Sequence, residues 1–167
     1  MKLHIIDNGF ANKAGHNFEY TKSVYEEWVR RGNEALIYCN PVNDETITGK
    51  FNLIPIFASD KRRSYFLESG MGFLNKPFHA LNGLFNIFEA NNSFLHDLKK
   101  IDKRTLSNDD VVFVHTLNQR SLFALYRWYR SLNQYQRPRF VLLFRNTTMH
   151  YGIKNGISQY ISFIKHC

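Results

Sequence analysis

The residue types that could carry chemistry gather after two short apolar segments of the chain. Asp7, Asn8 and Gly9 close the first segment, and His115 closes the second. An imidazole exchanges protons near neutral pH, and a glycine-bearing loop that leads into a helix can offer N–H groups to an anion. These two places are therefore the first candidates for a binding or catalytic site.

Each candidate has a functional and a structural interpretation. Gly15, His16 and Asn17 could bring N–H groups and an imidazole to a phosphate or a hydroxyl, or could simply begin a helix. His115 fits either a cleft residue or a hydrogen-bonded core histidine. Arg145 ends an apolar segment and needs an anionic partner, which could be a ligand or a carboxylate of the chain such as Asp7 or Glu19. Both interpretations stay open at this point.

Motifs for several other chemistries are absent from the sequence. It contains no G-x-G-x-x-G or G-x-x-x-x-G-K-[ST] phosphate loop, no H-E-x-x-H and no G-x-S-x-G. Cys39 and Cys167 lack metal-ligand spacing. The neighbouring pairs Asp109-Asp110 and Glu26-Glu27 point in different directions, as expected for a turn and a solvated helix face. We therefore predict no metal site and no bound cofactor.

The elements that must position these residues alternate between strands and helices. Short apolar segments predict strands at 3–7, 35–39, 53–57, 111–115 and 140–144, the third an edge strand or a short one because of Pro55. Helical periodicity predicts helices at 16–31, 77–101, 118–133 and 157–166, with Asn91-Asn92 a break point. On the first helix the predicted buried stripe contains Phe18, Thr21, Tyr25, Trp28 and Val29.

This alternation predicts an α/β fold, a Rossmann-like doubly wound parallel sheet with helices on both faces. In such sheets ligands bind beyond the carboxyl ends of the strands, where the strand order reverses. The strands at 3–7 and 111–115 are the expected neighbours there, which places the two candidate segments together. The sequence ends inside the helical pattern at 157–166, so the sheet is expected to be incomplete at its C-terminus.

Composition limits the class of protein. The chain has 167 residues, enough for one domain, with 44% apolar residues and a net charge of +8. This apolar content excludes a disordered tail. No apolar run reaches the ~20 residues of a membrane span, and Asp7 comes too early for a signal peptide. We therefore expect a cytoplasmic domain with free thiols and an anionic partner: nucleic acid, acidic lipid or a phosphorylated small molecule.

Three stretches resemble the N-terminal half of the GT-B glycosyltransferases, most closely retaining enzymes that use nucleotide-sugar donors. They are residues 5–9 with 14–20 and the helix end at 31–35, residues 112–116 (VFVHT) and residues 140–147 (FVLLFRNT). The resemblance covers nearly the whole chain, and it rests more on the order of elements than on any one residue. Arg145 departs from the histidine that the family often has there.

The resemblance implies that residues 1–167 form an acceptor-binding domain of an enzyme that transfers a sugar from a nucleotide-sugar to a glycan or a lipid-linked acceptor. His115 would be the catalytic residue, contacting the transferred sugar or its acceptor. Asn8, Gly9, Gly15, His16, Asn17 and Arg145 would bind substrate. The nucleotide-sugar is then a co-substrate and not a cofactor. The donor-binding half is absent, so the chain alone should be inactive unless that half is supplied in cis or in trans.

Basic residues suggest further partners. Lys61, Arg62 and Arg63 stand among aromatic residues, a mixture suited to an anionic membrane surface or a lipid-phosphate acceptor. The same loop could instead fold its aromatics onto the core.

Two alternatives to a glycosyltransferase domain remain. One is a nucleic-acid-binding module using aromatics such as Trp128 and Tyr129, although no nucleic-acid-binding signature is present. The other is a non-catalytic remnant of a truncated gene.

Overall fold

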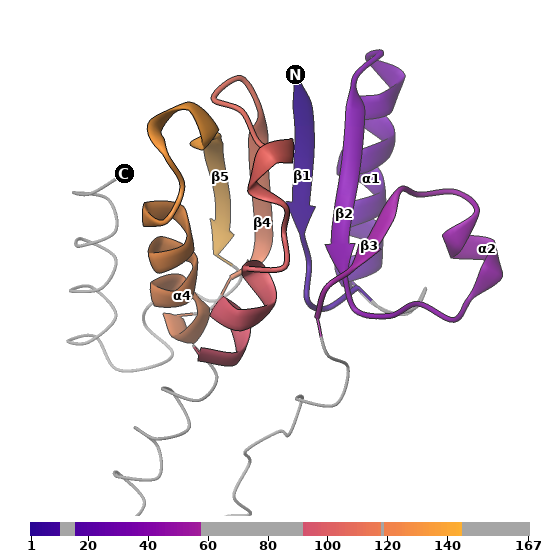
Figure 1. Ribbon diagram of the computed structural model, residues 1–167. Coiled ribbons are helices and arrows are strands. Elements are labelled where there is room, and N and C mark those ends of the chain that lie inside the picture. Colours follow the sequence, from indigo (N-terminus) through magenta and orange to yellow (C-terminus); the bar gives the residue numbers. More distant parts are fainter. Residues whose placement is uncertain (11–15, 58–91, 118, 145–167) are drawn as a thin grey trace, which may run out of the picture.

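The computed structural model describes residues 1–10, 16–57, 92–117 and 119–144 of the chain (Figure 1). Their strands form one parallel sheet in the order β3-β2-β1-β4-β5. The strands are β1 (Lys2–Ile6), β2 (Glu34–Cys39), β3 (Leu53–Pro55), β4 (Val111–Leu117) and β5 (Arg139–Phe144). The strand order reverses between β1 and β4, so the sheet is an α/β sheet of the Rossmann-like type, as the sequence predicts.

Helices lie on both faces of this sheet. The labelled helices are α1 (His16–Arg30), α2 (Glu45–Thr48) and α4 (Gln119–Arg130), residues 92–98 are also helical, and η3 (Lys103–Thr105) and η4 (Gln134–Gln136) are single 3₁₀ turns. In Figure 1, α1 and α4 stand on opposite sides of the strands. Such double coverage explains why the strands are almost continuously apolar, since both of their faces are buried.

Alternation along each strand decides which residues face which helix layer. Leu3 and Ile5 of β1 pack with Phe18 and Tyr25 of α1. Val112 and Val114 of β4, together with Ile6 and Tyr38, pack on the other face with Leu125 and Trp128 of α4 and with Phe94, Leu95 and Leu98 of the 92–98 helix. Because the side-chain period of a strand is two, Asp7 and His115 continue the row that faces α1.

One irregularity interrupts the ladder between β4 and β5. Val114 is paired with Leu142, and Leu117 is paired with Phe144. The chain of β4 thus advances three residues where β5 advances two, so one extra residue lies in β4 between Val114 and Leu117. This is a β-bulge, a feature that bends a strand and re-aims its side chains.

The described elements agree with the predicted ones to within a few residues, with three differences. Helix α2 is not predicted from the sequence; Asp44 caps it by accepting a hydrogen bond from Thr46 N–H. The predicted helix 77–101 is described only from residue 92, and it ends at 98, before Ile101. Val29, expected on the buried stripe of α1, is exposed and lies in the last turn of the helix. The predicted helix at 157–166 lies outside the described residues.

Candidate functional site

Three polar side chains meet in a buried position at the carboxyl ends of β1 and β4. Thr21 Oγ1 donates a hydrogen bond of 2.8 Å to Asp7 Oδ2 and lies 2.7 Å from Nε2 of His115. The same Nε2 lies 3.1 Å from Asp7 Oδ2. Asp7 and Thr21 are 0% exposed and His115 is 3% exposed. We call Asp7, Thr21 and His115 the switch-point triad.

The strand register brings the triad together. Ile5 is paired with Phe113 and Ile6 with Val114, so the next step of the ladder sets Asp7 beside His115. Both side chains point toward α1, whose Thr21 lies opposite them. A buried carboxylate is costly unless hydrogen bonds satisfy it, and here a hydroxyl and an imidazole do so. Thr21, which occupies the predicted apolar stripe, is therefore a polar residue of the core with a defined partner.

The loop after β1 is anchored to the triad. Asp7 Oδ1, the second carboxylate oxygen, accepts a 2.8 Å hydrogen bond from Gly9 N–H. The side chain of Asn40, at the end of β2, donates a 2.6 Å hydrogen bond to the Asn8 carbonyl. The backbone of Asn8 and Gly9 is thus fixed from two strands. Such a fixed start is what a loop needs if its later residues are to hold a ligand.

Two aromatic rings flank the imidazole of His115. The ring of Phe113 is stacked at 5.7 Å between centroids, and the ring of Tyr20 lies at 6.1 Å. Tyr20 is 56% exposed although it adjoins a buried histidine. The triad therefore lies directly under a surface aromatic residue, a position from which a ligand on Tyr20 would be close to the imidazole.

The bulge in β4 falls at the same place. Its extra residue lies between Val114 and Leu117, the span that contains His115. Bulges are frequent beside active sites because they change the direction of a side chain without breaking the sheet. The sequence carries no signal for it, since the span has neither glycine nor proline and the irregularity exists only relative to β5.

Cys39 ends β2 on the same face of the sheet and adds no nucleophile to the site. It is a buried free thiol. Burial, and then the nearby charge of Asp7, raise the pKa of the Cys39 thiol to about 12. Because the thiolate is the reactive species, this cysteine is chemically inert at neutral pH.

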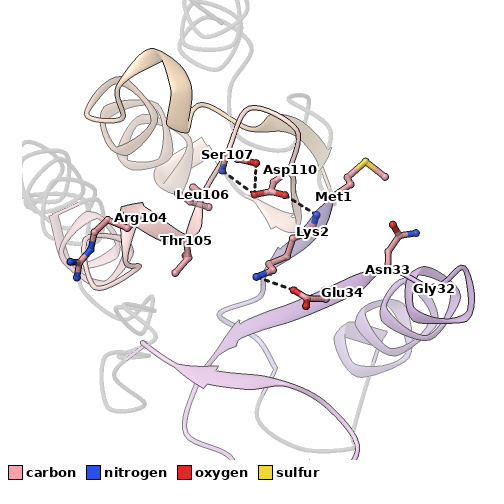
Figure 2. A pocket seen from close by; sticks show the side chains of 10 residues that line it. All are labelled: Met1, Lys2, Gly32, Asn33, Glu34, Arg104, Thr105, Leu106, Ser107 and Asp110. Atoms are coloured by element: carbon pink, nitrogen blue, oxygen red, sulfur yellow. Dashed lines mark hydrogen bonds and ion pairs between the residues drawn. The ribbon is translucent and has the colours of Figure 1, made fainter.

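A second polar group lies at the opposite end of the strands (Figure 2). There Asp110 accepts hydrogen bonds from Lys2 N–H at 2.7 Å and from both the N–H and the hydroxyl of Ser107 at 2.9 Å. These residues border a pocket of about 530 Å³. The Lys2 ammonium is itself paired with Glu34 at 3.0 Å. Asp110 thus pairs with Lys2 and Ser107, the Lys2 ammonium pairs with Glu34, and Asp110 serves the turn structure that the sequence predicts for it.

The structure brings some of the predicted site residues together. His115, Asn8 and Gly9 lie at one corner of the sheet, joined through Asp7. His16 and Asn17 form the first residues of α1, and their side chains are not among those described. Gly15, Arg145 and the Lys61-Arg62-Arg63 group lie outside the described residues. Sequence reasoning misses Thr21 as a member of the site, and Trp128, offered there as an aromatic for nucleic acid, is 0% exposed and cannot stack on a base.

Comparison with protein-family models, with curated proteins and with solved structures finds no match to this chain. Within residues 1–10, 16–57, 92–117 and 119–144, no three His, Cys, Asp or Glu side chains are grouped as a metal ion would require. In the same part of the chain, no helix is both long and apolar enough to cross a bilayer. The site must therefore be interpreted from its own geometry.

Proposed function

We propose that this chain is the acceptor-side domain of a glycosyltransferase that uses a nucleotide-sugar donor. In this proposal the corner formed by β1, β4 and the start of α1 binds the hydroxyl-rich part of the substrates. A second domain, in the same polypeptide or in a partner, supplies the donor nucleotide site. The acceptor is a glycan or a lipid-linked glycan, and the Lys61-Arg62-Arg63 group is the candidate contact with lipid phosphate or an anionic membrane surface.

The observation that carries the proposal is the switch-point triad itself. It lies where ligands bind in open α/β sheets, beyond the carboxyl ends of the strands at the point of reversed order. Its imidazole is oriented by two polar neighbours and adjoins an exposed aromatic ring, Tyr20. Sugars are recognised by this combination, since a ring face packs on an aromatic side chain while hydroxyls pair with fixed polar groups.

Ligand binding by the 167-residue chain tests the proposal directly. Amide and histidine side-chain NMR signals are followed while neutral oligosaccharides, UDP-glucose and GDP-mannose are added in turn. We expect the signals of Asn8, Gly9, Tyr20 and His115 to shift with at least one saccharide, with a dissociation constant of about 1 mM for a half-site. The titration is repeated with the control variant His96→Ala. His96 is an exposed histidine on the helix that covers the other face of the sheet.

Two results would count against this function. If saccharides and nucleotide-sugars leave the signals of all four residues unshifted, sugars are excluded as ligands of this site. Tight binding of a short RNA that weakens steeply with salt would favour the nucleic-acid alternative, which the net charge of +8 keeps open.

The mass of the native polypeptide tests the second domain. An antibody against an N-terminal peptide would show a band at about twice the mass of the 167-residue chain if donor and acceptor domains share one polypeptide. A band at 19.8 kDa, the mass of the 167 residues alone, would direct the search to a co-purifying subunit. A preparation with neither a partner nor a ligand response would support the truncated remnant.

A further inference from the structure

The hydrogen-bond donors and acceptors of the triad can be assigned atom by atom. The hydroxyl of Thr21 has one proton, and it is donated to Asp7 Oδ2. An ionised carboxylate only accepts hydrogen bonds. The remaining contacts are those of His115 Nε2 with Thr21 Oγ1 at 2.7 Å and with Asp7 Oδ2 at 3.1 Å. Since neither oxygen has another proton to give, Nε2 must carry the proton of these contacts.

The opposite tautomer, with the proton on Nδ1, leaves one of these contacts without a proton. If Nε2 held a lone pair, the Thr21 proton would have to turn toward it, and Asp7 Oδ2 would lose its donor. A lone pair of the carboxylate would then face a lone pair of Nε2 at 3.1 Å with no proton between them. In a position where Asp7 is 0% exposed, no solvent shell offsets such an arrangement.

We propose that Asp7, which also accepts a hydrogen bond from the Thr21 hydroxyl, is a positioning residue that holds His115 as the Nε2–H tautomer, so that Nδ1 of His115 accepts a hydrogen bond from a sugar hydroxyl. The choice of ligand group rests on the proposed function, whereas the tautomer rests on the triad geometry alone. Among the described residues, Nδ1 has no hydrogen-bond partner, and Phe113 and Tyr20 fix the plane of the ring on which it lies. A carboxylate that fixes the proton on one ring nitrogen leaves the other nitrogen as an acceptor for the ligand.

Nitrogen-15 NMR of the histidine rings tests the tautomer without any ligand. The 167-residue chain is labelled, and the His115 ring is assigned by comparison with His115→Gln. At mildly alkaline pH, where an ordinary imidazole is neutral, we expect a protonated-type shift for Nε2 and an unprotonated-type shift for Nδ1. A His115 ring that carries its proton on Nδ1, or that averages both forms as a free imidazole does, would overturn the proposal.

Variants identify which neighbour sets the tautomer. Asp7→Asn puts an amide in place of the carboxylate, and an N–H₂ group turned toward Nε2 should reverse the tautomer to Nδ1–H. Thr21→Ser and Thr21→Val should both keep Nε2–H, because Asp7 still accepts the proton. Tyr20→Leu is the matched control: it removes a ring contact but no hydrogen bond of the triad, and the tautomer should not change.

The fold of each variant is checked by its amide spectrum and its melting temperature. A folded Asp7→Asn protein that keeps the Nε2–H form would show that Asp7 does not act as proposed. If Asp7→Asn does not fold, the wild-type spectrum still decides the tautomer. Failure of saccharide binding with the expected tautomer would refute the proposed function alone, whereas saccharide binding with the other tautomer would refute only the role of Asp7.

Discussion

Nε2 of His115 lies 3.1 Å from Oδ2 of Asp7, although 108 residues separate them in the chain. The contact crosses from β4 to β1, the two strands at which the order of the sheet reverses. Thr21 closes the triangle from α1. One strand pair and one helix therefore suffice to assemble the site, and its residues can be tested separately for support of the fold and for ligand binding.

Two substitutions of His115 should separate its structural role from its ligand role. His115→Gln can place an amide N–H₂ near the position of Nε2, and so keep the hydrogen bonds to Asp7 and Thr21 while removing Nδ1. His115→Ala removes the imidazole donor from two buried oxygens, Asp7 Oδ2 and Thr21 Oγ1, so we expect it to lower the free energy of unfolding by about 2–4 kcal/mol. His115→Gln should lose about 1 kcal/mol or less, yet bind saccharide more weakly. Urea denaturation and the NMR titration measure the two effects. Equal stability losses in both variants would show that Nε2 does not carry the buried contacts.

Acid should destabilise the protein through His4, a second buried histidine. Burial lowers the pKa of His4, against the partly opposing charge of Asp110, whose Oδ2 lies 3.7 Å from Nε2. The unfolded chain takes up this proton near the ordinary pKa of 6.5, and the folded protein only at lower pH. Stability from neutral His4 is therefore present above pH 6.5 and is lost as the pH falls below it.

Denaturation curves between neutral pH and about pH 5 measure this loss. His4→Gln cannot titrate, so its stability relative to wild type should rise as the pH is lowered. His96→Gln, which replaces an exposed histidine, is the control variant measured alongside. Parallel curves for wild type and His4→Gln would contradict the prediction.

A separate loss of stability is expected from Asp110 at lower pH. Burial raises the pKa of the Asp110 carboxyl, but the hydrogen bonds from Lys2 and Ser107 outweigh burial and lower this pKa below 3.8. The stability that the ionised Asp110 contributes is therefore lost as the pH falls below 3.8 and through the lowered pKa.

The thiol of Cys39 should be protected from alkylation in the native protein. Its pKa of about 12 leaves about one thiolate in ten thousand at pH 8, and the side chain is fully buried. With Cys167→Ser removing the other thiol, a thiol reagent such as iodoacetamide should react only after guanidinium is added. Reaction of the native variant at the rate of the denatured one would show that the end of β2 opens in solution.

Two glycines should respond in opposite ways to alanine. Gly32, after α1, has φ of +77°, and the space around its Cβ position is open, so Gly32→Ala should cost about 1 kcal/mol of backbone strain alone. Gly49, after α2, has φ of −78° and would meet only the Glu45 carbonyl at 3.6 Å. Gly49→Ala should be neutral or stabilising by up to about 1 kcal/mol. Urea midpoints compare the pair, and a Gly49→Ala loss as large as that of Gly32→Ala would contradict the conformational argument.

The strands and the position of the site could be predicted because both follow from short-range patterns. Apolar runs of about five residues mark β1 and β4, and parallel strands collect their carboxyl ends at one edge, so Asp7 and His115 could be placed at the same corner. Thr21 was harder to recognise, because its spacing matches the apolar stripe of α1. A threonine on such a stripe needs a buried partner, and that partner is visible only once β1 and α1 are packed.

Features that depend on pairing could not be predicted in this way. The bulge beside His115 is a mismatch between the ladders of β4 and β5, and no residue in the span signals it. The burial of Trp128 depends on how α4 rotates against the sheet, since its neighbours in the sequence are a cation, Arg127, and an aromatic residue, Tyr129. The short helix α2 depends on a single cap, Asp44, in a segment without helical periodicity.

β1 and β4 are neighbours in the sheet but lie far apart in the sequence, and this has a consequence for synthesis on the ribosome. β2 begins at Glu34, so one edge of β1 can be paired as soon as the first helix and second strand have emerged. The other edge has to wait for Val111, and until then the central strand of the sheet keeps an open row of N–H and carbonyl groups. An exposed strand edge is a template for association with other chains. The nascent protein therefore presents this open edge of β1 to other chains from the emergence of β2 until the emergence of β4.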